Sequence, residues 1–300
     1  MWIVYAIGSA LLAGAVAILA KLGVRQVDAT VATAVRTTMV LGFTWLIALL
    51  TIAAAEPALP LGEALVYKLQ ALTPQHWLFL GLSGVATGVS WLAYFKALRH
   101  GDVNKVAPVD KSSLIMTMLL AVVILGEPLS VAGAYAMVLI GIGTYAMIEP
   151  KAGSGRATRG YGWLMYAVAA AVAAALTAIL AKIGMQGVDS SLGTALRTIV
   201  VLVMAWLMVL VSGKQAEVRR IDRRSMLFLG LSALATGGSW LLYFAALQQG
   251  PASVVVPIDK LSIVPTVLFS VLILREKVSP RALLGLVVIV AGTLLLVLQP

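Results

Sequence analysis

Long apolar stretches separated by short polar segments make up most of the chain. A run of about 20 apolar residues is long enough to cross the hydrocarbon core of a bilayer as a helix. Because the runs lack strict alternation of apolar and polar residues, they predict helices rather than a β-barrel. We therefore expect an all-α integral membrane protein of ten transmembrane helices. The predicted spans are 2–20, 30–51, 77–98, 104–125, 130–148, 161–181, 191–211, 226–247, 253–274 and 279–298.

This pattern occurs twice along the chain. Residues 78–98 and 227–247 are identical at sixteen of 21 positions, and shorter matching segments lie in the first and fourth spans of each half. Two copies of five spans, an odd number, enter the membrane in opposite orientations. We therefore predict a 5+5 inverted repeat with internal pseudo-two-fold symmetry, an architecture of secondary transporters. Its parts are a first repeat at 1–150, a linker at 151–160 and a second repeat at 161–300.

Composition supports the membrane prediction and narrows the chemistry. The chain is 61% hydrophobic and 11% charged, with a mean hydropathy of +1.01, whereas soluble domains contain about 25% charged residues. It has no cysteine, which excludes disulfides, thiol catalysis and cysteine-bound metals. No basic segment precedes the first apolar run, which argues against a cleaved signal peptide. We expect neither a metal nor a cofactor.

The basic residues are divided unequally between the two sets of loops. Of 22 Lys and Arg, fifteen lie at or near the loops that follow odd-numbered spans, and those loops should stay on the cytoplasmic side. We therefore expect both termini to face outward from the inner (cell) membrane. Since orientation explains the net charge of +10, we expect no nucleic-acid partner. The fifteen are Lys21, Arg25, Arg99, Lys105, Lys151, Arg156, Arg159, Lys214, Arg219, Arg220, Arg223, Arg224, Arg275, Lys277 and Arg281.

Three charged positions at membrane depth recur in both halves. Such charges are costly in lipid and are candidates for function. We predict that they act as gates or substrate contacts in two layers that flank a midplane site. A purely structural ion-pair network stays open as the alternative. Pro108 and Pro257 precede the acidic members and predict disturbed helices there. The charged positions are Arg36, Asp110 and Lys111 in the first half and Arg197, Asp259 and Lys260 in the second.

The third span of each half carries hydroxyl and aromatic residues on one helical face. We expect this stripe to line a cavity, although hydroxyl groups also join membrane helices to each other. Gly81, Gly84 and Gly88 in the same span predict close helix packing. The members of the stripe are Ser83, Thr87, Ser90, Trp91 and Tyr94, with the counterparts Ser232, Thr236, Ser239, Trp240 and Tyr243.

The repeated motifs resemble those of the drug/metabolite transporter superfamily, specifically its EamA-type domain. A TA-x-RT stretch opens the second span of each half, at 33–37 and 194–198. The third spans read ATG-x-SW-x-x-YF-x-AL and the fourth spans P-[VI]-DK-x-S. The resemblance covers nearly the whole chain and implies a ten-helix bundle with a central cavity that exports or exchanges small metabolites. Ten-span relatives are usually drawn with cytoplasmic termini, whereas the charges here predict the reverse.

We therefore predict a secondary transporter of small polar metabolites, such as amino acids, that works by alternating access as a monomer in the bilayer. Protons are a candidate coupling ion, carried by Asp110 and Asp259, although neighbouring basic residues favour the ionised carboxylates. A passive uniporter or channel-like facilitator, or a flippase of a lipid-linked sugar, stays open as an alternative. An enzyme is not expected, because the GxSG motif at 81–84 has no histidine near it to activate its serine.

Overall fold

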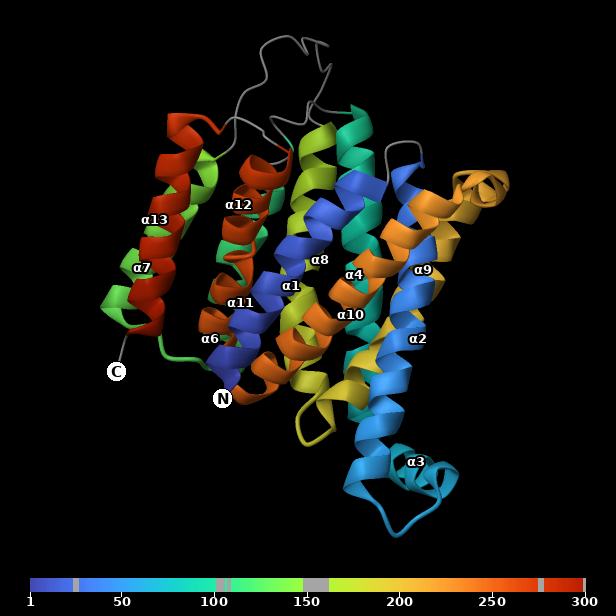
Figure 1. Cartoon of the computed structure of the whole chain (residues 1–300). Coiled ribbons are helices and arrows are strands. Elements are labelled where there is room, and N and C mark those ends of the chain that lie inside the picture. Colours follow the sequence, from blue (N-terminus) through green and yellow to red (C-terminus); the bar gives the residue numbers. More distant parts are fainter. Residues whose placement is uncertain (24–26, 101–105, 107–108, 148–161, 275–277, 299–300) are drawn as a thin grey trace.

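The computed structural model describes residues 1–23, 27–100, 106, 109–147, 162–274 and 278–298, and within these ranges it is helical, without strands (Figure 1). The first half contains α1 (Trp2–Gly23), α2 (Ala29–Ala55), α3 (Leu61–Gln70), α4 (Pro74–His100), α6 (Ser113–Leu125) and α7 (Val131–Ala146). The second half contains α8 (Gly162–Gly184), α9 (Ser190–Val211), the 3₁₀ helix η1 (Gln215–Arg220), α10 (Arg223–Gln249), α11 (Ala252–Lys260), α12 (Ile263–Leu274) and α13 (Pro280–Val297).

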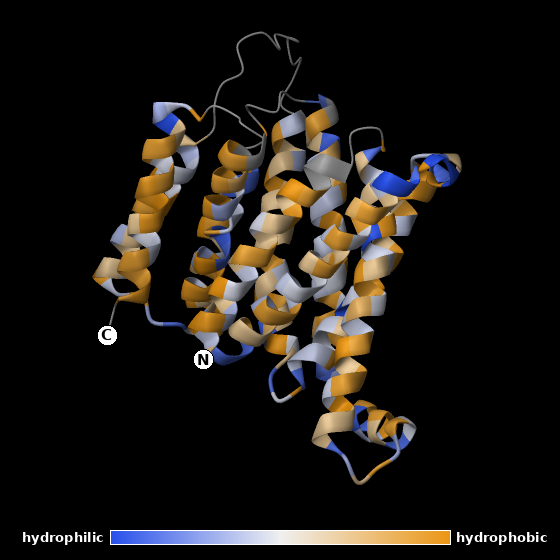
Figure 2. Ribbon diagram, viewed as in Figure 1, coloured by the Kyte–Doolittle hydropathy of each residue, from blue (hydrophilic) through white to orange (hydrophobic). Residues whose placement is uncertain are grey.

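The helices confirm the predicted all-α membrane protein. Eight helical segments of the described chain are long and apolar enough to cross a membrane, and α7 is a shorter apolar helix. The 13-residue α6 occupies the place of the fourth span. Figure 2 shows apolar residues along the length of the helices and hydrophilic residues concentrated towards their ends, the distribution that a bilayer requires. Many large apolar side chains, such as Val123 and Val211, are exposed on the outside of the bundle.

The contacts between helices are symmetric, because exchanging the two halves converts each contact into its counterpart. The third span of each half packs on the first span of the other, as α4 on α8 and α10 on α1. The second spans pack together as α2 on α9, and the fifth spans as α7 on α13. Figure 1 shows that α1 and its counterpart α8 run in opposite directions. The two five-span halves are therefore inverted and interleaved.

Glycines allow close approach at the helix crossings, where a side chain would collide. A Cβ atom added to Gly88 in α4 would lie 2.4 Å from the Met204 Cβ in α9, and Gly84 is similarly tight. The counterpart of Gly88, Gly237 in α10, packs against the Phe43 ring in α2. These contacts confirm the packing prediction for Gly84 and Gly88. It was wrong for Gly81, which has no atom near its virtual Cβ.

The two ends of the bundle differ. One end, which we call the terminal end, carries both chain termini and α3 (Figure 1). The opposite end, which we call the basic end, carries η1 and the start of α10, with Arg219, Arg220, Arg223 and Arg224. The segment between the second and third predicted spans contains α3, a helix that the sequence pattern did not predict. There Lys68 donates a hydrogen bond to Glu56 (2.7 Å), which raises the pKa of Lys68 above its ordinary value.

The ninth span is broken into α11 and α12. Pro257 lies inside α11, so the break follows the proline at Leu261 and Ser262 instead of falling at it. The Leu261 and Ser262 N–H groups donate to carbonyls three residues back, which tightens the chain into a 3₁₀-like turn. The break leaves Asp259 and Lys260 at the last turn of a short helix. Pro108, the counterpart of Pro257, lies outside the described residues.

Candidate functional site

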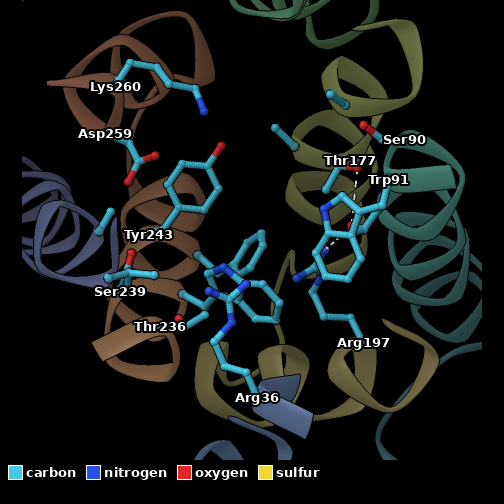
Figure 3. Close-up of a pocket in the computed structure, with 17 residues that line it drawn as sticks. Arg36, Ser90, Trp91, Thr177, Arg197, Thr236, Ser239, Tyr243, Asp259 and Lys260 are labelled. Atoms are coloured by element: carbon cyan, nitrogen blue, oxygen red, sulfur yellow. Dashed lines mark hydrogen bonds between the residues drawn. The ribbon is translucent and has the colours of Figure 1, made fainter. Parts of the chain in front are cut away.

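A cavity of about 390 Å³ lies inside the bundle and is lined by both halves (Figure 3). Twelve of its 17 lining residues form six repeat-related pairs, whereas the other five all belong to the second half. The pairs are Ala13 and Ala174, Val16 and Thr177, Arg36 and Arg197, Thr87 and Thr236, Ser90 and Ser239, and Trp91 and Trp240. The unpaired residues are Ala178, Tyr243, Phe244, Asp259 and Lys260.

The structure brings together most members of the hydroxyl and aromatic stripe. Thr87, Ser90, Trp91, Thr236, Ser239, Trp240 and Tyr243 line the cavity. Tyr94 is not among the lining residues. It packs instead against a small cluster formed by Ala97, Val106 and Ala167.

The charged positions are divided between the cavity and its surroundings. Arg36, Arg197, Asp259 and Lys260 line the cavity, whereas Asp110 and Lys111 do not. The Lys111 ammonium lies 3.8 Å from the Asp110 carboxylate, and the Lys111 side chain is 58% exposed. Lys111 borders a smaller cavity, of about 140 Å³, next to α6 and α7. The expected layer of Arg36, Asp110 and Lys111 around one site is therefore not assembled here.

Arg197 is held by two hydroxyl groups of the other half and two aromatic rings of its own half, in an arrangement that we call the arginine clasp. Its Nε donates to the Ser83 hydroxyl (3.3 Å) and its Nη2 to the Thr87 hydroxyl (2.8 Å). The guanidinium lies 4.3 Å from the Phe244 ring centroid and 5.5 Å from that of Trp240, at cation–π distances. Only 1% of Arg197 is exposed. The clasp therefore surrounds a buried charge with neutral hydrogen-bond acceptors and aromatic rings.

The same constellation around Arg36 is not formed. Arg36 makes no hydrogen bond or ion pair with the residues that the structure describes, although it lines the cavity. The counterpart of Ser83 is Ser232, whose hydroxyl is buried and has no hydrogen-bond partner in that part of the chain. Thr236, the counterpart of Thr87, donates only to the Ser232 carbonyl of its own helix. One of two repeat-related clasps is closed and the other is open.

Asp259 is the carboxylate of the cavity lining. Its Oδ1 accepts a hydrogen bond from Ser9 in α1 (2.7 Å), and the Ser9 hydroxyl lies 3.1 Å from that of Ser239. Within the described ranges, the ion pairs are Lys68–Glu56, Lys111–Asp110, Lys182–Glu127 and Lys214–Asp28, and none includes Arg36, Arg197 or Lys260. The alternative in which an acidic residue of the layer pairs with the arginine is therefore not found there.

A second constellation joins the two halves at the terminal end, and we call it the glutamate tie. The Glu127 carboxylate, between α6 and α7, accepts hydrogen bonds from the Lys182 ammonium (2.8 Å) and the Ala252 N–H (2.6 Å). It also accepts from the Ser253 N–H (2.8 Å) and hydroxyl (2.6 Å), so it caps α11 across the halves. Burial favours a raised pKa for Glu127, but hydrogen bonds from Lys182 and Ser253 outweigh it and hold the pKa below its ordinary value.

Sequence reasoning did not identify the glutamate tie, because Glu127 and Lys182 lie 55 residues apart in different loops. A signal was present, since Lys182 is one of only two basic residues near the loops that follow even-numbered spans. Its partner could not be chosen without the fold. Among the residues that the structure describes, no group of three or more His, Cys, Asp or Glu could hold a metal ion.

Comparison with known proteins places this geometry in context. An uncharacterized transporter in the cobO 3′ region of Sinorhizobium sp is 46% identical over 134 residues, 45% of this chain and 95% of that protein. An uncharacterized transporter of Archaeoglobus fulgidus is 26% identical over 212 residues, 70% of this chain and 71% of that protein. The probable 4-amino-4-deoxy-L-arabinose-phosphoundecaprenol flippase subunit ArnE of Salmonella paratyphi C is 34% identical over 77 residues, 26% of this chain and 69% of that protein.

A solved crystal structure shares the fold, with a TM-score of 0.74 at 16% identity, over 99% of this chain and 96% of that one. The profile of the EamA-like transporter family matches twice, at residues 1–148 and 161–298. These two matches cover nearly the whole chain and correspond to its two halves. The chain is a multi-pass membrane protein that belongs to the EamA-like transporter family.

Proposed function

We propose that this chain carries small polar metabolites across the inner membrane by alternating access, with cargo bound in the central cavity. One observation carries the proposal: the arginine clasp is closed at Arg197 and open at Arg36, although both halves contain its residues. In an inverted repeat the two halves can exchange conformations around a fixed central site. That exchange would move Arg36 onto Ser232 and Thr236 while releasing Arg197.

The orphan hydroxyl of Ser232 gives this exchange an energetic basis. A buried polar group without a partner costs about 1–3 kcal/mol. The cost is present in the conformation described here and would be relieved when Arg36 reaches Ser232. A difference of a few kcal/mol between two conformations keeps both accessible. The two states would therefore be close enough in free energy for cargo to shift the balance.

The charges at the two ends support a direction in the membrane. We propose that the basic end faces the cytoplasm, because Lys and Arg in short loops favour that side. In the described conformation the glutamate tie joins both halves at the terminal end. The terminal end would then be the closed outer gate of a cavity that communicates with the cytoplasm. Amino acids stay the candidate cargo, and a monomer holds both halves of the site.

Flipping of a lipid-linked sugar is the second candidate function. It is favoured by the 34% identity over 77 residues to the Salmonella ArnE protein, whose name describes a probable flippase subunit. A flippase of this kind would need cargo to enter the cavity from the bilayer. The first candidate needs entry only from water, and an uptake experiment separates them.

The test uses purified protein in liposomes, loaded or not with an amino-acid panel, with and without an imposed proton gradient. Gradient-driven accumulation supports a proton-coupled carrier, and equilibration that ignores the gradient supports a facilitator or exchanger. A lack of flux for every amino acid, together with flipping of a lipid-linked sugar, would reject the first candidate in favour of the second.

A matched cysteine pair tests alternating access itself. Ala13 and Ala174 are repeat-related, line the cavity and sit in a chain without cysteine. We expect cargo to change the reactivity of Ala13→Cys and Ala174→Cys towards a membrane-impermeant maleimide in opposite directions from one side. Equal reactivity of both variants from both sides, unchanged by cargo, would instead indicate a channel.

A further inference from the structure

The charges that line the cavity do not balance. Arg36, Arg197 and Lys260 contribute three cations, and Asp259 contributes one carboxylate. None of the three cations has a carboxylate within ion-pair distance in the described ranges. Unpaired charge at membrane depth is costly, and such residues mark the route of a ligand. The protein therefore supplies two positive charges more than its own carboxylate can neutralise.

Arg36 is the cation with the most unused binding capacity. A guanidinium presents five N–H donors in a planar fork that matches a carboxylate or a phosphate. None of the five N–H donors of Arg36 has a partner among the residues that the structure describes, whereas Arg197 already donates to Ser83 and Thr87. The Nη1 of Arg197 makes no hydrogen bond with the described residues, and Arg197 also lines the cavity. Figure 3 shows both arginine side chains directed into the same space.

The other walls limit what else the ligand contains. Trp91 and Trp240, a repeat-related pair, line the cavity and offer flat apolar surfaces. A volume of about 390 Å³ lies at the small end of the range for ligand pockets, roughly 300–1,000 Å³. A small molecule with one anionic group and one flat or apolar part matches these walls.

We infer that the cavity recognises an organic anion, whose carboxylate or phosphate group binds at Arg36 with help from Arg197. That this anion crosses the membrane rests on the proposed function. That it binds in the cavity does not. An amino acid satisfies it through its carboxylate, and a lipid-linked sugar satisfies it through its phosphate. The shared determinant is the negative charge, and an ammonium group is not required.

Matched probes test the sign of the charge. Phenylalanine, 3-phenylpropionate and phenethylamine differ only in whether they carry both charged groups, the anion alone or the cation alone. Binding is measured as the ligand-dependent shift in the unfolding temperature of the purified full chain, and flux is measured in liposomes. Phenyl phosphate in solution and undecaprenyl phosphate in the vesicles supply the phosphate arms.

We expect 3-phenylpropionate or a phosphate probe to bind and phenethylamine not to bind. Arg36→Gln should weaken anion binding at least tenfold, and Arg36→Lys should weaken it less because the charge remains. Lys68→Gln, on α3 far from the cavity lining, is the control and should bind like the parent. Binding of undecaprenyl phosphate alone, lost in Arg36→Gln, would support the same determinant with a lipid headgroup as its source.

The results separate this inference from the proposed function. Anion binding that depends on Arg36, without flux, supports the inference and rejects transport of that anion. Flux of phenethylamine without binding of any anion supports a carrier and overturns the inference. Anion binding that is unchanged in Arg36→Gln also overturns it, since the site would then lie elsewhere. If phenylalanine, 3-phenylpropionate, phenyl phosphate and undecaprenyl phosphate all fail to bind, the inference is wrong.

Discussion

Arg36 and Arg197 occupy equivalent positions in two copies of one sequence, yet their surroundings differ. Arg197 is buried, clasped by Ser83 and Thr87, and stacked on aromatic rings. Arg36 has no described partner, and the hydroxyl that should receive it is buried and unsatisfied. Since local sequence is nearly the same, the difference must come from how the halves sit against each other. The sequences around the two arginines are repeated, whereas their surroundings in this conformation are not.

The lining of the cavity repeats this lesson. Its five unpaired residues all come from the second half, and their counterparts Asp110 and Lys111 lie elsewhere. If the asymmetry is a state, each half passes through both environments during a cycle. If the asymmetry is permanent, the two halves have separate roles. Changes to the clasp, the tie and the surface distinguish these two cases, from the largest expected effect to the smallest.

Removing either arginine should have the largest effect on transport and tests whether Arg36 and Arg197 have equivalent roles. Hydrogen bonds to charged groups contribute about 1.5–3 kcal/mol each, so losing a clasp should reduce transport about a hundredfold or more. We expect Arg36→Gln and Arg197→Gln to be similarly impaired, because a full cycle uses both clasps. Initial uptake rates in liposomes measure this, with monodisperse elution as the folding control. Normal transport in one of the two variants would make the asymmetry permanent.

Weakening the glutamate tie should shift the balance between the two ends. In Glu127→Gln an amide replaces a carboxylate that accepts four hydrogen bonds, at a cost of about 2 kcal/mol to the closed terminal end. We expect faster maleimide labelling of cavity cysteines from the terminal side. Glu63→Gln, on the exposed face of α3, is the matched control and should label like the parent. Identical labelling in both variants would exclude the tie from gating.

The same tie predicts a pH dependence. The folded-state pKa of Glu127 lies below its ordinary value, so its contribution is fully present at a pH above the unfolded-state pKa. It is lost as the pH falls through the lower, folded-state pKa. We expect acidification in this window to increase labelling from the terminal side in the parent but less in Glu127→Gln. A pH response that is equally large in both proteins would assign it to another group.

Serine to alanine changes sharpen the comparison with a difference of sign. Ser83→Ala removes an acceptor from the closed clasp, whereas Ser232→Ala removes an orphan hydroxyl that burdens the described state. We expect shifts of about 1 kcal/mol, near fivefold in population, in opposite directions. The ratio of reactivity at Ala13→Cys and Ala174→Cys reports the populations. Shifts of the same sign would contradict an exchange between the halves.

The smallest effect is expected where no repeat partner exists. Lys68 and Glu56 pair near α3, in a loop with an insertion of 12 residues relative to the second half, and both side chains are about one-third exposed. Exposed ion pairs contribute about 0.2–1 kcal/mol. We expect Lys68→Ala to transport within twofold of the parent and to unfold at nearly the same temperature. A large loss of transport would show that the insertion belongs to the working part of the protein.

Much of the fold could be predicted from the sequence because bilayer length and repetition are long-range signals carried by whole segments. The length of the apolar runs predicts the spans, and the repeated sequence predicts the inverted halves. The helical spacing of polar and aromatic residues in the third spans predicts seven of the residues that line the cavity. Pro257 predicted a disturbed ninth span but not the position of its break, since the turn at Leu261 and Ser262 depends on backbone hydrogen bonds beyond the proline. The helix α3 was missed because it is too short for the hydrophobic pattern to register.

The candidate site was less predictable because conformation decides which copy contributes. Asp110 and Asp259 sit in the same motif, and only the packing of α11 against α1 brings Asp259 to Ser9 and the cavity. The partners of Glu127 likewise come from two other elements, so no spacing along the chain connects them. Sequence identified the chemical groups, and the arrangement of the helices selected among them.

The short helix α11 links the glutamate tie to the central cavity. Its first residues are held by the carboxylate of Glu127, and its last turn carries Asp259 and Lys260 into the cavity. The helix is nine residues long, so a change at one end lies close to the other end. Thermodynamic reciprocity then applies: if cargo binding at the last turn of α11 changes the proton affinity of Glu127 at the first turn, protonation of Glu127 must change cargo affinity by the same factor. The acidity of the medium at the terminal end would thus act as an allosteric effector of the central site, with no proton crossing the membrane.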